Sequence, residues 1–142
     1  MVLLTTLAGF ARPARAFFHN EPEIETGRNV YGKSCASCHG AKLEGQPNWQ
    51  EGNPDGTYPA PPHDETGHTR HHDDTMLLDY IRRGGQVVLD DMGVTFKSGM
   101  PPFAGALSEA EIGAVLGYIK STWPDRIRAA QEERTRAKEA DE

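Results

Sequence analysis

The sequence predicts a helical protein, and three segments carry the signals that predict it. Residues 23–34 begin with acidic side chains, which the helix dipole favours in a first turn. The segment ending before Gly84 follows two aspartates suited to an N-cap, and residues 109–122 follow Ser108 with Glu111 three positions on, a capping box. A chain of 142 residues with these elements is expected to form one domain with short extensions.

The first predicted helix carries Gly27 and Tyr31, which are four residues apart and therefore share one face. Ile24 and Val30 lie on the same side. A glycine there allows a second helix to approach closely, and the tyrosine ring can pack across the crossing. The helix leads directly into the two cysteines of the chain.

Those cysteines belong to the motif Cys35-Ala36-Ser37-Cys38-His39, whose spacing is that of covalent c-type haem attachment. Two thiols one helical turn apart can each add to a vinyl group on one edge of the porphyrin. The imidazole of the next residue can then bind the iron. Apolar residues make up only 37% of the chain, so a buried macrocycle would supply apolar mass that the protein core lacks.

Three other interpretations of the motif stay open at this point. A zinc site could combine the two cysteines with His68 and His72, although the gap after Cys38 is longer than in a compact finger. A thioredoxin-like dithiol would need a βαβ pattern, which is absent here. A disulfide closing so short a loop would constrain little of the unfolded chain.

The segment after the motif, residues 40–49, is rich in turn residues. An iron-bound imidazole needs its second nitrogen held by an acceptor, often a backbone carbonyl. Pro47 is the predicted acceptor for His39, because its φ is locked and its carbonyl is free. Trp49 is predicted either to line the haem edge or to be an ordinary packed side chain.

Residues 52–74 form a long segment with four prolines and four histidines, and such a loop is normally functional or disordered. In one interpretation it is a solvated insert whose polar groups bond locally and reach the haem propionates through Tyr58, Arg70 or a histidine. In a second it is a labile copper or zinc site. In a third a histidine replaces methionine on the iron. The histidines concerned are His63, His68, His71 and His72.

A helix is predicted to run from Asp73 or Asp74 through Ile81 and to close at Gly84-Gly85 after two arginines. The following apolar run, residues 86–89, fits a strand or a helical turn equally well.

Met100 is the predicted second iron ligand, because it lies in the segment Gly99-Met100-Pro101-Pro102. A thioether is a soft, neutral ligand suited to low-valent iron, and the two prolines hold the loop rigid. Met76 lies inside a helical pattern and Met92 lacks following prolines, so both are weaker candidates.

The predicted helix at residues 109–122 has an apolar stripe that includes Val115, Tyr118 and Ile119, and Trp123-Pro124 ends it. This stripe is the expected partner of the Gly27 and Tyr31 face. Residues 125–142 are highly charged and are expected to form a frayed, solvated helix or a disordered tail.

Residues 1–16 resemble a secretory signal peptide, with an apolar run and an Ala14-Arg15-Ala16 cleavage site. Export to the periplasm is therefore expected, with N-terminal anchoring as the alternative, and the mature chain is expected to have no membrane span. The net charge is −6, and cleavage would remove two arginines and leave 13 basic against 21 acidic residues. This charge argues against nucleic-acid binding and favours redox partners with a basic docking patch.

From about Ile24 to Trp123 the chain resembles class I, single-haem cytochrome c of the small bacterial type. The resemblance rests on the Cys35 to Gly40 motif, on Pro47-Asn48-Trp49 where the family often has Pro-Asn-Leu, on Met100-Pro101, and on the pairing of the two helix faces. It implies an all-α fold of three to five helices around one haem, with the first and last helices crossing. It also implies thioethers at Cys35 and Cys38 and axial ligands His39 and Met100.

The resemblance implies electron transfer without a catalytic residue, by a domain at residues 17–124. The insert at residues 52–74 and the extension at 125–142 depart from the family pattern and leave the partner and any second function open. One alternative is a metal-handling haem protein that binds copper through the four histidines. Others are a haem subunit of a larger dehydrogenase or oxidase complex, and a haem enzyme or gas sensor with an open iron.

Overall fold

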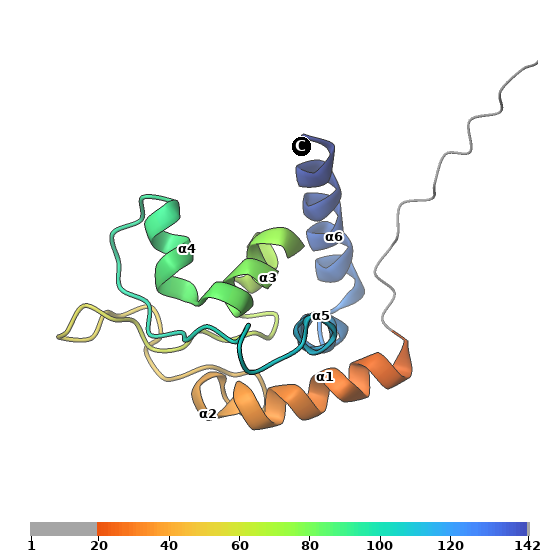
Figure 1. Cartoon of the computed structure of the whole chain (residues 1–142), viewed down its shortest axis with the longest axis horizontal. Coiled ribbons are helices and arrows are strands. Elements are labelled where there is room, and N and C mark those ends of the chain that lie inside the picture. The colour runs from red at the N-terminus through yellow and green to blue at the C-terminus, as the bar shows by residue number, and fades with distance from the viewer. Residues whose placement is uncertain (1–19, 142) are drawn as a thin grey trace, which may run out of the picture.

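The computed structural model describes residues 20–141, which fold into helices joined by long loops (Figure 1). The predicted signal peptide at residues 1–16 lies outside this range. Within it there is no strand, only an isolated bridge between Thr57 and Lys97, so the expected all-α fold is confirmed. The helices are α1 (Glu21–Ser34), α2 (Ala36–His39), the 3-10 helix η1 (Thr69–His71), α3 (Asp74–Arg83), α4 (Gly85–Asp91), α5 (Glu109–Ser121) and α6 (Asp125–Ala140).

Helix α1 begins two residues earlier than predicted because its capping box lies further upstream. The side chain of Asn20 accepts a hydrogen bond from the backbone N–H of Glu23, and the Glu23 carboxylate accepts one from the backbone N–H of Asn20. Pro22 lies in the first turn, where a missing N–H costs nothing.

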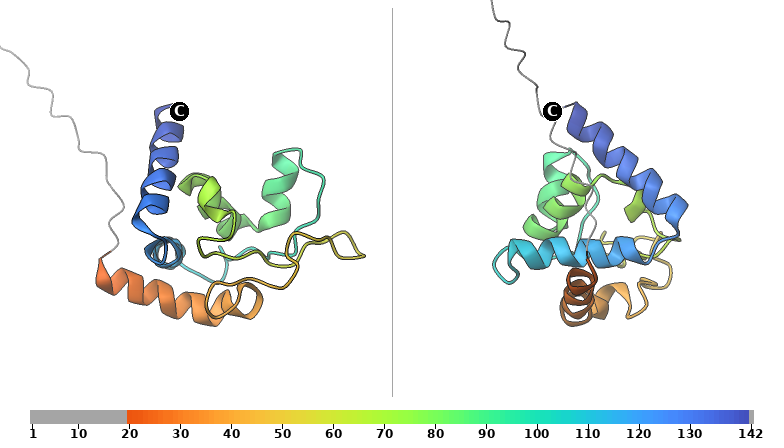
Figure 2. Two further views of the ribbon diagram at one scale, coloured as in Figure 1. Left: turned by 180° about the vertical axis from the view of Figure 1, so that it is seen from behind. Right: turned by 90° about the vertical axis from the view of Figure 1, so that its right-hand side faces the viewer.

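Helices α1 and α5 cross, and their contact is the main helix pairing of the fold. Figure 1 shows α5 end-on above α1, and the second view in Figure 2 shows α1 end-on below α5. The expected faces meet: the rings of Tyr31 and Tyr118 lie 5.5 Å apart, and Gly27 lies against the backbone of Ala114. The predicted capping box of Ser108 and Glu111 starts α5.

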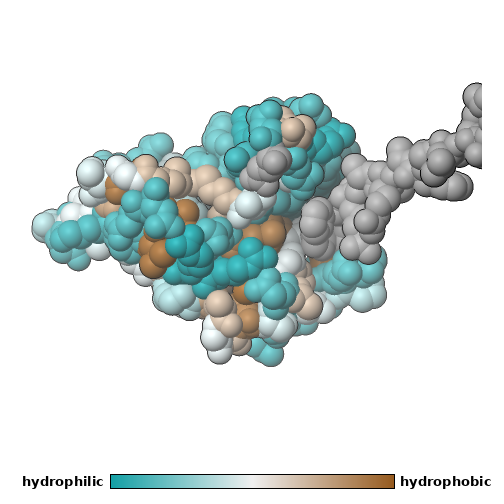
Figure 3. Space-filling model, turned by 45° about the horizontal axis from the view of Figure 1, so that its top comes forward, coloured by the Kyte–Doolittle hydropathy of each residue, from teal (hydrophilic) through white to brown (hydrophobic). Residues whose placement is uncertain are grey.

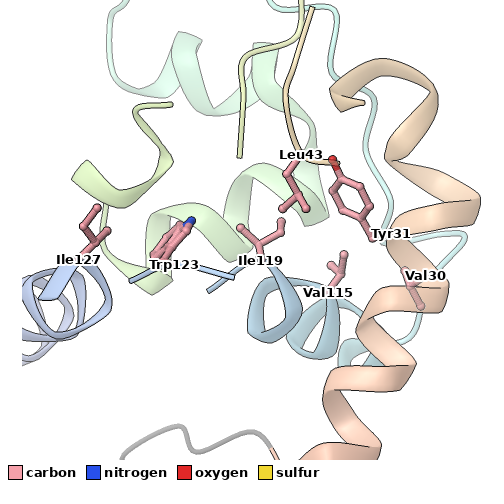
Figure 4. Close-up of a cluster of buried hydrophobic side chains, with 7 residues drawn as sticks. All are labelled: Val30, Tyr31, Leu43, Val115, Ile119, Trp123 and Ile127. Atoms are coloured by element: carbon pink, nitrogen blue, oxygen red, sulfur yellow. The ribbon is translucent and has the colours of Figure 1, made fainter. Parts of the chain in front are cut away.

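The buried core is a continuous row of side chains that joins α1, α5 and α6 (Figure 4). Leu43, from the loop after α2, packs into this row between the helices. The hydroxyl of Tyr31 donates a hydrogen bond to the carbonyl of Gly40, 2.8 Å away, so the core also holds the start of that loop. The members of the row are Val30, Tyr31, Leu43, Val115, Ile119, Trp123 and Ile127.

Residues 74–91 form two consecutive helices, α3 and α4. Asp73 caps α3 by accepting a hydrogen bond from the backbone N–H of Met76, as predicted. The apolar run at residues 86–89, for which a strand was equally open, lies in α4. Gly84, with a φ of 82°, separates the two helices because it adopts a conformation that other residues rarely accept.

Of the two expectations for the C-terminal segment, a helix is confirmed and a disordered tail is wrong, and the helix is packed against the fold instead of frayed. Helix α6 is regular from Asp125 to Ala140 and buries Ile127, Gln131 and Thr135. These contacts hold it against η1 and α3. The buried face of α6 is hard to recognise in the sequence because charged residues cover its solvent-facing side. The face of the molecule in Figure 3 is mostly hydrophilic.

A buried polar cluster fastens α6 to the rest of the fold. The ammonium of Lys120 in α5 contacts both carboxylate oxygens of Asp74 at 2.8 and 2.9 Å, and the two side chains are only 5% and 8% exposed. The amide of Gln131 donates to Asp74 over 2.7 Å, and the hydroxyl of Thr135 accepts from the Asp74 backbone N–H. Three helices therefore share one charge pair.

None of the helices that the structure describes is both long and apolar enough to cross a membrane.

Candidate functional site

The two cysteines lie where α1 ends and α2 begins, so the end of the long helix positions them. Cys35 is the C-cap of α1 and the N-cap of α2, and its carbonyl accepts hydrogen bonds from the backbone N–H groups of Cys38 and His39. This tight turn brings both thiols and the imidazole onto one short helix. Both cysteines are free thiols, Cys35 partly buried and Cys38 exposed. Burial raises the pKa of the Cys35 thiol to about 11, with the nearby Cys38 adding to the effect.

His39 is buried, at 8% exposure, and its ring is held by a backbone carbonyl. The Nδ1 atom lies 2.8 Å from the carbonyl oxygen of Pro61. Because a carbonyl only accepts, Nδ1 carries the proton and Nε2 presents its lone pair. Burial lowers the pKa of His39, and the bond to Pro61 partly opposes this, so the neutral form of the ring is favoured.

The prediction that Pro47 supplies this carbonyl is wrong, because the acceptor is Pro61, 22 residues after His39. The segment that holds the His39 ring is therefore Pro61-Pro62-His63, and not Pro47-Asn48-Trp49, on which the family resemblance partly rested. Pro47 itself is exposed. The reason given for Pro47, a locked φ and a free carbonyl, applies equally to Pro61, and only the folded loop distinguishes them.

Close packing around two glycines holds the Pro61 carbonyl in place. A Cβ on Gly45 would lie 2.4 Å from the nitrogen of Pro62, and one on Gly67 would lie 2.0 Å from the carbonyl oxygen of Pro62. Leu43 accepts hydrogen bonds from the backbone N–H groups of residues 63 and 64. The two loop segments thus run side by side, and the acceptor of His39 is fixed from both sides.

His63 lies directly on His39. The two imidazole rings are stacked, with centroids 4.0 Å apart and an interplanar angle of 25°. The Nδ1 atom of His63 lies 2.8 Å from the hydroxyl of Thr69. Burial lowers the pKa of His63 well below its usual range, and the neighbouring histidines 39 and 68 lower it further. The neutral form of the ring is therefore favoured. The sequence does not distinguish His63 from the other histidines of the loop, so its stacking on His39 was not predicted.

The four histidines of the 52–74 segment do not converge on one point. The rings of His68 and His72 lie 5.7 Å apart, whereas His63 stacks on His39 instead. In residues 20–141 no three histidine, cysteine, aspartate or glutamate side chains are grouped as a metal ion would require. The ring of His63 stacks on that of His39 instead of lying near Met100.

The polar groups of this segment bond locally, as its first interpretation expected. The carboxylate of Asp64 accepts from the backbone and hydroxyl of Thr66. Arg70 donates through Nη1 to the carbonyl of Glu65 over 2.7 Å. Such side-chain-to-backbone bonds give a polar loop a defined shape without a metal.

Two aromatic candidates from the sequence occupy different parts of the loop. Trp49 is partly buried and its ring centroid lies 5.4 Å from that of His68. Tyr58 is exposed and packs edge-on against Phe96 at 5.2 Å. Haem-edge contact by Trp49 and propionate binding by Tyr58 or Arg70 stay predictions.

Met100 lies on a loop that is seated on the junction of α3 and α4. Its carbonyl accepts from the backbone N–H of Gly85 over 3.0 Å, and its own N–H donates to the hydroxyl of Ser98 over 3.2 Å. Beyond the two prolines, the backbone N–H of Phe103 donates to the carbonyl of Ile81. Backbone hydrogen bonds therefore hold the loop at Met100 and just after it in the chain. Met92, by contrast, is 53% exposed at the end of α4.

The residues present fit a covalently attached haem. Two free thiols and a neutral imidazole share one helical turn, and the hydrogen bond to Pro61 selects the tautomer that a metal needs. The thioether of Met100 is the second donor of the type that haem iron accepts.

Comparison with known proteins agrees with this geometry. The family model described as "Cytochrome c" matches residues 24–123, which is most of the chain. No curated protein and no solved structure matches it. The matched residues include the Cys-x-x-Cys-His turn and the crossing of α1 and α5. The chain therefore belongs to the cytochrome c family.

Proposed function

We propose that this protein is a single-haem electron carrier whose haem is joined by thioethers to Cys35 and Cys38, with His39 and Met100 as axial ligands. Family membership already supports haem-based electron transfer. The bound haem supplies an iron that exchanges one electron at a time. The protein holds both ligands in rigid surroundings, so little reorganisation accompanies that exchange.

The hydrogen bond from His39 to Pro61 is the observation that carries this proposal. An imidazole whose Nδ1 is already engaged has one lone pair to offer, at Nε2. Its place directly after two free thiols leaves covalent haem as the cofactor that uses all three groups together. A thioether as the second ligand raises the reduction potential relative to a second imidazole.

Spectroscopy of protein made in a host that attaches haem to exported proteins tests the proposal. We expect a c-type absorption spectrum, a mass increase of one haem, and a red-region charge-transfer band from methionine on ferric iron. Met100→Ala should abolish that band, while the matched variant Met92→Ala should keep it. A stably folded but colourless protein would refute the whole proposal, and a band that survives Met100→Ala would refute the ligand assignment.

Gly85→Ala should weaken the proposed bond between Met100 and iron although Met100 itself is unchanged. A Cβ at Gly85 would lie 2.0 Å from the Ser98 hydroxyl, which accepts the Met100 N–H, so the loop must shift. We expect a weaker charge-transfer band and a loss of about 1–3 kcal/mol in unfolding free energy. Gly99→Ala is the control, because nothing lies within 4 Å of its Cβ position, and it should leave both measurements unchanged.

The proposed location is the periplasm, and the proposed partners are redox proteins with a basic docking patch. The net charge of −6 supports this choice, because opposite charges steer two proteins together. We expect the rate of association with such a partner to fall as ionic strength rises. Stopped-flow electron transfer at two or more salt concentrations measures this, and a rate that rises with salt would contradict a basic patch.

A further inference from the structure

The ring of His63 is held more firmly than a loop side chain normally is. Its backbone N–H donates to the carbonyl of Leu43, and its carbonyl accepts from the indole Nε1 of Trp123, both over 2.8 Å. The side chain is fixed by Thr69, whose buried hydroxyl lies 2.8 Å from Nδ1. Tyr31 adds an edge-on ring contact at 6.5 Å. The imidazole therefore cannot tilt without disturbing both the core and the loop.

The bond to Pro61 alone does not fix the plane of the His39 ring. A hydrogen bond holds one atom, Nδ1, whereas the torsion that turns a histidine ring is broad. A flat neighbour at 4.0 Å and 25° removes that freedom, because any rotation of His39 would drive its edge into the face of His63. The two contacts together set both the position and the plane of the ring.

We propose that His63 is a positioning residue that sets the plane of the His39 imidazole, with Thr69 holding His63 in register. This inference rests on the proposed role of His39 as an iron ligand. Residues that contact a metal ligand orient it and tune the metal, and such contacts are usually hydrogen bonds to the ligand's second nitrogen. Here that position is taken by Pro61, and the stacked ring supplies the missing restraint.

The orientation of an axial imidazole determines how unpaired spin spreads over the porphyrin of ferric haem. The haem methyl resonances in the proton NMR spectrum report that spread. His63→Leu introduces an apolar side chain of similar size, which removes the flat face and the hydrogen bond to Thr69. We expect the order and spacing of the methyl resonances to change, and the equilibrium constant for electron exchange with a reference redox couple to shift with them.

Thr69 offers a second pair of variants that leave His63 in place. Thr69→Val preserves the shape of the side chain and removes the hydroxyl, whereas Thr69→Ser keeps the hydroxyl. The valine variant should change the methyl resonances in the same direction as His63→Leu but less, and the serine variant should restore the wild-type pattern. His71→Leu is the control, because it removes an exposed histidine from the same segment, and it should change nothing.

The result separates this inference from the proposed function. Covalent haem, seen by mass and by the c-type spectrum, should persist in the wild type and in every variant. Methyl resonances that match the wild type in His63→Leu would overturn the positioning role. If His63→Leu does not fold, the valine and serine variants of Thr69 decide, and identical spectra for those two would overturn it equally. A wild-type protein that binds no haem would refute the proposed function instead.

Discussion

Asp74→Asn should destabilise the haem-loaded protein by about 3–5 kcal/mol, the usual cost of removing one partner from a buried ion pair. Within residues 20–141, Asp74 is the carboxylate that pairs with the Lys120 ammonium, and both side chains are almost completely buried. The substitution keeps the shape of the side chain but leaves Lys120 without an opposite charge. It also weakens the bond from Gln131 that holds α6. Denaturant unfolding followed by circular dichroism measures the loss.

Two further variants identify the cause of that loss. Asp74→Leu combined with Lys120→Met removes both charges and should recover most of the stability, since apolar replacement of a whole buried pair is often neutral. Glu133→Gln breaks an exposed pair with Arg136 on α6, and it should cost less than about 1 kcal/mol. A double variant that is no more stable than Asp74→Asn would show that the charge pair is not the source of the effect.

Gly27→Ala should destabilise the protein by about 3 kcal/mol and lower its melting temperature by about 10 °C. The added Cβ would lie 2.0 Å from the backbone carbonyl oxygen of Ala114 and 2.8 Å from the Cβ of Tyr118. Neither atom can rotate away, so α1 and α5 must move apart. That movement would separate Tyr31 from Tyr118 and open the core next to the loop that Tyr31 holds.

The same helices contain two matched controls for Gly27→Ala. Nothing lies within 4 Å of a Cβ placed on Gly32 in α1 or on Gly113 in α5. Alanine at either position should stabilise the protein by about 0.5–1 kcal/mol, because alanine loses less conformational freedom than glycine in a helix. Equal melting temperatures for the alanine variants at residues 27 and 32 would contradict the close crossing.

The parts of the fold that the sequence predicted correctly are those coded by neighbouring residues. The capping box of Ser108 and Glu111 and the cap at Asp73 each involve residues three apart, so their hydrogen bonds follow from local spacing. The crossing face at Gly27 and Tyr31 was also readable, because helical periodicity places residues four apart on one side. The turn that joins the cysteines to His39 is equally local.

Helix α6 shows where charge composition misled the prediction. Its buried residues, Ile127, Gln131 and Thr135, are spaced four apart, but two of them are polar and give no apolar stripe. The two polar residues are buried against Asp74 of α3, which is in turn paired with Lys120 of α5. A polar side chain is stable in the interior only when its partners are already there, and a single segment cannot reveal that.

The sequence by itself determined helices α1, α3 and α5, the thiol pair with its adjacent imidazole, and the rigid loop around Met100, since each depends on residues close along the chain. Only the tertiary structure decided that Pro61 and not Pro47 holds His39, and that His63 stacks on the same ring. Both prolines carry an equally free carbonyl, and four histidines share one loop. The difference between them is their position in space, which depends on how Gly45 and Gly67 let two distant loop segments pack together.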